Sequence, residues 1–119
     1  MPRKTKTAKL LPRLRVVCAE EIALGPGKAD LLALVDQTGS IREAAERMNM
    51  SYMRAWKLIQ TMNACFREPV IVAERGGNVR GGARLSKTGR KALALYRQME
   101  QTCLQKTAQS WTELSSLLR

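Results

Sequence analysis

Two helix-start signals that lie close together constrain this chain more than any other feature of its sequence. Ser40 is followed by Glu43 in the Ser-x-x-Glu arrangement of a helix start, and Ser51 is placed to cap a second helix. Asn49, between them, tolerates the left-handed backbone that a tight turn requires. The sequence therefore predicts a short helix, a sharp turn and a longer helix over about residues 51–68.

The flanking segments extend this unit on both sides. Apolar residues at helical spacing over residues 28–37 predict a first helix that ends at Gly39, and residues 13–24 predict a strand or short hairpin before it. A β-branched run at residues 70–73, a glycine-rich tip and a return strand at residues 83–85 predict a second hairpin. Three helices followed by a hairpin form the winged helix-turn-helix, whose third helix enters the major groove of DNA.

These patterns predict a mainly α fold with a small β component. We expect a basic tail over residues 1–12, a winged helix-turn-helix over 13–86, with the helix-turn-helix at about 41–67 and the wing at about 70–86, and a helical region over 87–119. Its apolar stripe either folds back as a fourth core helix or, as we expect, pairs two copies of the chain. The residues expected at this dimer interface are Leu93, Tyr96, Leu104, Ala108, Trp111, Leu114 and Leu118.

The amino-acid composition indicates what kind of molecule the chain binds. The chain has 119 residues, 21 Lys and Arg against 10 Asp and Glu, and a net charge of +11, which favours a polyanion such as nucleic acid. Ribosomal proteins and membrane-surface proteins share such a charge. Two Trp, two Tyr and one Phe are few for recognition of single strands by stacking. We therefore expect double-stranded DNA as the partner.

Several other classes of protein are disfavoured. The chain has no His, and Cys18, Cys65 and Cys103 are widely spaced, so we expect reduced thiols and no metal site or cofactor. The sequence contains no recognisable catalytic constellation, so an enzyme is not expected. The basic N-terminus lacks the apolar stretch of a secretory signal, and no apolar run could span a bilayer. A cytoplasmic location is expected.

Several segments together resemble the N-terminal DNA-binding domain of the molybdate-responsive ModE regulators. They are Met50-Ser51-Tyr52-Met53-Arg54-Ala55-Trp56, Met62-Asn63, the glycine-rich tip through Gly81-Gly82, and Ala83-Arg84-Leu85-Ser86-Lys87-Thr88-Gly89. The resemblance covers about residues 14–105 and extends more distantly to LysR-type regulators. In the ModE family, paired molybdate-binding domains follow this region; the chain stops where they would begin, so molybdate binding is not expected from it alone.

The predicted function is a sequence-specific transcription regulator that reads a palindromic operator as a homodimer. A less specific nucleoid or nucleic-acid-binding protein and a protein-interaction adaptor with a winged fold are the alternatives. The expected DNA contacts are Ser51, Tyr52, Met53, Arg54, Lys57, Gln60 and Thr61 in the third helix, and Arg75, Asn78, Arg80, Arg84 and Lys87 around the wing.

Overall fold

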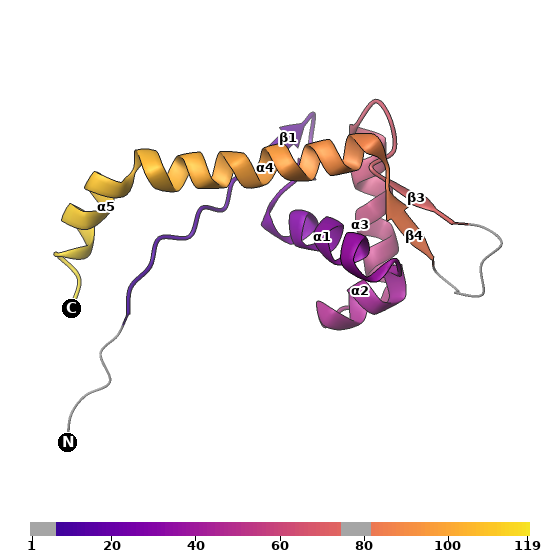
Figure 1. Ribbon diagram of the computed structural model, residues 1–119, viewed down its shortest axis with the longest axis horizontal. Coiled ribbons are helices and arrows are strands. Elements are labelled where there is room, and N and C mark those ends of the chain that lie inside the picture. Colours follow the sequence, from indigo (N-terminus) through magenta and orange to yellow (C-terminus); the bar gives the residue numbers. More distant parts are fainter. Residues whose placement is uncertain (1–6, 75–81) are drawn as a thin grey trace, which may run out of the picture.

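The computed structural model describes residues 7–74 and 82–119, and within them it is mainly helical with two small antiparallel sheets (Figure 1). The predicted fold class is confirmed. In chain order the elements are β1 (Val16–Cys18), β2 (Glu21–Leu24), α1 (Pro26–Thr38), α2 (Ile41–Arg47), α3 (Tyr52–Cys65), β3 (Ile71–Ala73), β4 (Ala83–Leu85), α4 (Lys87–Lys106) and α5 (Ala108–Ser115).

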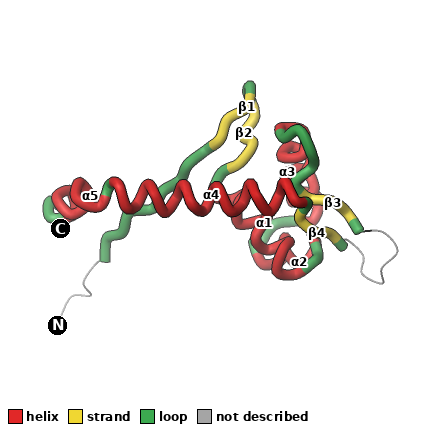
Figure 2. Tube along the Cα trace, turned by 45° about the horizontal axis from the view of Figure 1, so that its top comes forward, coloured by secondary structure: helices red, strands yellow, loops and turns green. Residues whose placement is uncertain are grey.

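The core lies where α1, α2 and α3 meet the β3–β4 hairpin and the first half of α4. In both views α4 runs past this group of helices, and its second half and α5 extend beyond them (Figures 1 and 2). The side chains that form the centre come from all of these elements and are almost fully buried; they include Leu31, Leu32, Val35, Ile41, Ile59, Met62, Val70, Leu85 and Tyr96. Burial of this apolar surface is the main stabilising contribution to the fold.

A two-residue turn joins α1 to α2 and also touches the wing. Gly39 has the left-handed backbone expected at a glycine stop, with φ 68°, and its carbonyl accepts a hydrogen bond from the N–H of Ala83 at 3.0 Å. Ser40 pairs with Gly82 as an isolated bridge beside the β3–β4 sheet. The turn therefore fixes the position of the wing against the helices.

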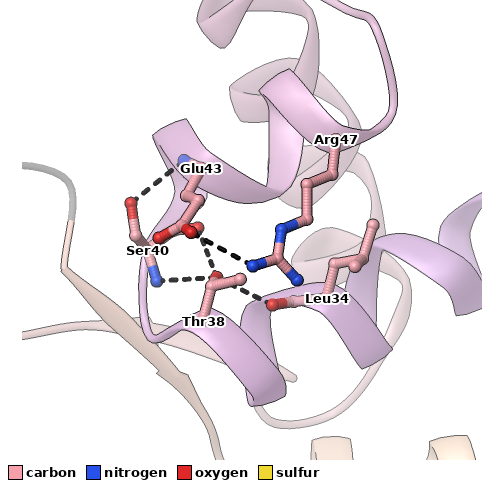
Figure 3. A network of polar contacts seen from close by, with 5 residues as sticks. All are labelled: Leu34, Thr38, Ser40, Glu43 and Arg47. Carbon is pink, nitrogen blue, oxygen red and sulfur yellow. Dashed lines mark hydrogen bonds and ion pairs between the residues drawn. The ribbon is translucent and has the colours of Figure 1, made fainter.

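Only half of the predicted Ser-x-x-Glu box forms, as Figure 3 shows. Ser40 Oγ accepts a hydrogen bond from the N–H of Glu43 at 3.1 Å, which caps α2. The Ser40 N–H donates to Thr38 Oγ1 at 3.2 Å, so it is already satisfied and has no need of the Glu43 carboxylate. That carboxylate instead pairs with Arg47 at 3.2 Å, one turn along the same helix.

The turn between α2 and α3 is as predicted. Asn49 has a left-handed backbone, φ 57°, and Ser51 Oγ accepts a hydrogen bond from the N–H of Arg54 at 3.1 Å. The end of α3 differs from the predicted one at about residue 68. The helix stops at Cys65, and Phe66 is already extended. The chain must leave the helix this early for Val70 and Ile71 to reach the side chain of Asn63.

Helix α4 approaches the segment before β3 very closely. Ser86 caps the helix by accepting a hydrogen bond from the N–H of Gly89 at 2.9 Å. A Cβ on Gly89 would lie 2.0 Å from the carbonyl oxygen of Val70. Only glycine allows this contact between helix and strand.

Tyr96 and the N-terminal segment hold α4 from the other side. The Tyr96 hydroxyl donates to the Leu14 carbonyl at 2.7 Å, and burial of the ring raises the pKa of the phenol. Leu10 and Pro12 are half-buried and line an apolar hollow with Trp111. Within the expected tail over residues 1–12, Leu10 and Pro12 therefore lie against the end of α4 and α5, and residues 1–6 lie outside the described part.

The C-terminal region is helical, as predicted, but divided. Thr107 separates α4 from α5, and its hydroxyl donates to the Cys103 carbonyl at 2.6 Å. No helix within residues 7–74 and 82–119 has both the length and the apolar character needed to cross a membrane.

We predict that Gly89→Ala will lower the free energy of unfolding by about 1–3 kcal/mol, because the new methyl group must push α4 away from Val70. Gly27→Ala in α1 is the matched control, since nothing lies within 4 Å of its Cβ position. Urea denaturation followed by circular dichroism measures both. Equal stability of Gly89→Ala and the unsubstituted protein would contradict the close approach.

Candidate nucleic-acid interface

Helix α3 has one face in the core and one in solvent. Ala55, Ile59 and Met62 are buried, whereas Met53 is 63% exposed and Arg54, Lys57 and Gln60 are also exposed. The helix is thus divided into a core face and an outward face. The outward face of the first two turns carries the two cations of the helix, Arg54 and Lys57.

The start of α3 places one aromatic ring between core and surface. Tyr52 is half-buried and packs against the core, and the guanidinium of Arg42 lies over its ring, 5.1 Å from the centroid. Arg42 was not among the residues expected from the sequence. It lies on α2 and Tyr52 on α3, so the turn between the two helices separates them in the chain. Ser51 is exposed and caps the helix, so its hydroxyl is already engaged as an acceptor.

The second half of α3 faces the β1–β2 hairpin. Gln60 and Thr61 line a hollow of about 430 Å³ together with Cys18 and Glu21 of that hairpin. A polyanion that reached Gln60 or Thr61 would also approach the Glu21 carboxylate, which would repel it. The electrostatically favourable part of the outward face is therefore its N-terminal half.

The wing is a two-stranded hairpin in which Ile71 lies opposite Leu85 and Val72 lies opposite Arg84. Arg84 is exposed and pairs with Glu74 at 3.4 Å, and Lys87 is exposed at the start of α4. An exposed ion pair of this kind contributes at most about 1 kcal/mol. The predicted contacts Arg75, Asn78 and Arg80 lie outside the described residues.

One side chain connects α3 to the wing. Asn63 Oδ1 accepts hydrogen bonds from the N–H groups of Val70 at 2.8 Å and Ile71 at 3.3 Å, and Asn63 Nδ2 donates to the Ile71 carbonyl at 3.1 Å. Asn63 was part of the sequence resemblance but had no assigned role. Its contacts set the position of β3 relative to the outward face of α3.

Three further cations lie near the start of α3. Arg13, Arg15 and Lys28 line a hollow of about 400 Å³ with Arg54, and we call this the basic hollow. Sequence analysis noted the basic N-terminus without assigning these residues to a site. With Arg54, they come from three separate segments, so no local spacing could have brought them together.

The expected dimer residues fall into two groups. Tyr96 is buried and Leu93 is half-buried, and both pack in the chain's own core, so Tyr96 is not available at a surface between copies. Leu104 and Trp111 are half-buried, and Ala108, Leu114 and Leu118 are exposed. The exposed side chains of Leu95 and Met99 also lie on α4, and the pattern analysis did not select them.

In the part of the chain that the structure describes, no three His, Cys, Asp or Glu side chains gather into a possible metal site. Arg97 bridges Asp30 at 2.9 Å and Glu100 at 3.1 Å, and the hydrogen bond that it donates to the Asp30 carboxylate raises the pKa of this guanidinium. These contacts join α1 to α4 and are structural.

Known proteins with similar sequences are ModE regulators and relatives of them. The chain is 36% identical over 92 residues to a molybdenum transport protein ModE of Azotobacter vinelandii, which covers 77% of this chain and 34% of that protein. It is 40% identical over 77 residues to the molybdenum-pterin-binding protein MopB of Rhodobacter capsulatus, which covers 65% of this chain and 28% of that protein. It is 30% identical over 77 residues to the DNA-binding transcriptional dual regulator ModE of Escherichia coli K12, which covers 65% of this chain and 29% of that protein.

The chain thus spans about a third of the length of the curated relatives that it matches. No protein-family model matches it. Among solved structures, a LysR family transcriptional regulator superposes with a TM-score of 0.55 at 15% identity, covering 78% of this chain and 30% of that one. These findings confirm the predicted resemblance to the ModE N-terminal region and to the LysR-type helix-turn-helix fold.

We predict that Asn63→Leu will destabilise the protein by about 2 kcal/mol, because it leaves buried backbone N–H groups of Val70 and Ile71 without an acceptor. Asn63→Asp keeps that acceptor and should cost less. Urea denaturation gives the stability, and amide hydrogen exchange at Val70 and Ile71 locates the effect. Unchanged protection of these two amides in Asn63→Leu would show that the side chain does not hold the wing.

Proposed function

We propose that this chain, a homologue of the N-terminal region of the ModE regulators, is a sequence-specific DNA-binding transcription regulator. The observation that carries the proposal is the outward face of the first two turns of α3. It presents Arg54 and Lys57 on a helix that the core and the wing hold in place. An α-helix fits the major groove of B-form DNA, where arginine and lysine contact guanine edges and phosphates.

The wing supplies a second contact in this proposal. Arg84 and Lys87 are exposed beside α3, and Arg84 can exchange its exposed Glu74 partner for a phosphate at little cost. Arg75, Asn78 and Arg80 belong to the same proposed contact by sequence. Ser51, Tyr52, Met53, Gln60 and Thr61 are proposed as further contacts along α3, with Gln60 and Thr61 limited by the nearby Glu21.

Pairing of two copies completes the proposal. The exposed Leu114 and Leu118 and the half-buried Trp111 lie on the part of the chain that extends beyond the core. A two-fold dimer formed there would present two α3 helices to successive major grooves, roughly 34 Å apart, and would read an inverted repeat. Double-stranded DNA and a second copy of this chain are therefore the proposed partners.

We predict that selection from a randomised duplex library will yield a site bound at least about 10³-fold more tightly than unrelated DNA. Arg54→Ala and Lys57→Ala should weaken binding and change the selected sequence, because these side chains reach base edges. Lys106→Ala, in the last turn of α4, removes the same charge far from α3 and is the control.

Fluorescence anisotropy over a series of salt concentrations measures these affinities. Equal affinity for all duplexes would favour the nucleoid alternative. Absence of binding at low salt would favour the adaptor.

We predict that the chain sediments as a dimer at tens of micromolar and that the double variant Leu114→Gln, Leu118→Gln sediments as a monomer, because the apolar area buried between copies is lost. Leu117→Gln is the control, since Leu117 is 80% exposed and lies outside the predicted stripe. Sedimentation equilibrium decides between the states. A monomeric unsubstituted chain at this concentration would contradict the proposal.

A further inference from the structure

We propose that the basic hollow binds a phosphate of the DNA backbone next to the major groove that α3 enters. This inference rests on the proposed function and extends it, because it adds Arg13, Arg15 and Lys28 to the contact surface. It also predicts that the protein covers DNA on the side of α3 away from the wing.

The charges around the basic hollow are of one sign. Arg13 and Arg15 come from the segment before β1, Lys28 from the first turn of α1 and Arg54 from the first turn of α3. No Asp or Glu of the described residues lines the hollow. None of the ion pairs found among residues 7–74 and 82–119 involves any of these four cations. Their repulsion favours an anion between them.

The backbone that carries Arg13 and Arg15, and the Lys28 ammonium, are held by contacts within the fold. The Leu14 carbonyl, between Arg13 and Arg15, accepts the hydrogen bond from the buried Tyr96. The Arg15 side chain passes Gly25 closely enough that a Cβ on Gly25 would lie 3.6 Å from Arg15 Cγ. The Lys28 ammonium donates to the Ile22 carbonyl. Little further ordering of this segment is therefore needed when an anion binds.

Arg54 decides in favour of DNA over a free anion. It lines the basic hollow and also lies on the outward face of α3, so an anion in the hollow would sit beside the proposed recognition helix. A duplex with α3 in its major groove carries a row of phosphates along the edge of that groove. Guanidinium groups bind such phosphates through two parallel hydrogen bonds, which suits a site formed largely by arginine.

The test compares single charge removals in the full chain. Arg13→Gln and Lys28→Gln should each weaken binding to the selected duplex about three- to tenfold and reduce the slope of log K against log salt by about 0.9 per lost phosphate contact. Sequence preference should stay the same, because phosphates carry no base information. Lys106→Gln is the matched control and should change neither quantity. Circular dichroism verifies that each variant is folded.

A second measurement locates the phosphate. Neutral methylphosphonates placed singly along the duplex should weaken binding of the unsubstituted protein at a position flanking the major-groove contact, and Arg13→Gln should lose that sensitivity. If Arg13→Gln and Lys28→Gln behave like Lys106→Gln while the α3 variants still impair binding, the basic hollow is not a DNA contact. The proposed function would then still stand. Saturable stabilisation by inorganic phosphate without any effect of the variants on DNA affinity would assign the hollow to a free anion and overturn the inference.

Discussion

The turn at Gly39 and Ser40 is the constraint on which the arrangement of the surface depends. The left-handed Gly39 ends α1, and Ser40 Oγ begins α2. The Gly39 carbonyl accepts a hydrogen bond from Ala83 of β4, and Ser40 pairs with Gly82 as an isolated bridge. The same two residues thus set the angle between the helices and the position of the wing. Asn63 makes the equivalent connection from α3 to β3. The wing is therefore attached to the helix-turn-helix at both of its strands, which fixes the described cations Arg84 and Lys87 in position relative to α3.

Two groups of cations can be distinguished, those paired with a carboxylate and those of the basic hollow. Arg47 pairs with Glu43 on α2, and Arg97 pairs with Asp30 and Glu100 where α1 meets α4, so these cations are largely compensated. The cations of the basic hollow, in contrast, lie beside the first turn of α3 without a lining carboxylate among the described residues. Glu21 lies beyond them, near the second half of α3. An approaching polyanion is thus attracted to one end of α3 and repelled from the other.

Local signals allowed most of the fold to be predicted from the sequence. The cap at Ser51 and the turn at Asn49 depend on residues within a few positions, and the structure confirms both. Tyr96 was instead placed at a dimer surface, because its burial depends on Leu14, far away in the sequence. The basic hollow was missed for the same reason. Tertiary contact, rather than helical periodicity, decides these positions, and periodicity alone cannot distinguish a core stripe from an interface.

The length of α4 and its attachment to the core would set the geometry of the proposed dimer. It is one continuous helix of 20 residues, about 30 Å long, which begins beside the wing and ends next to α5. Gly89 and Tyr96 fix its first half to the core, so its second half cannot pivot freely. The N-terminal segment also runs from the apolar hollow beside Trp111 to the basic hollow beside α3. Two chains joined near α5 would therefore hold their third helices at a set distance, and the spacing of the two half-sites would be determined by α4 rather than by the residues that read the bases.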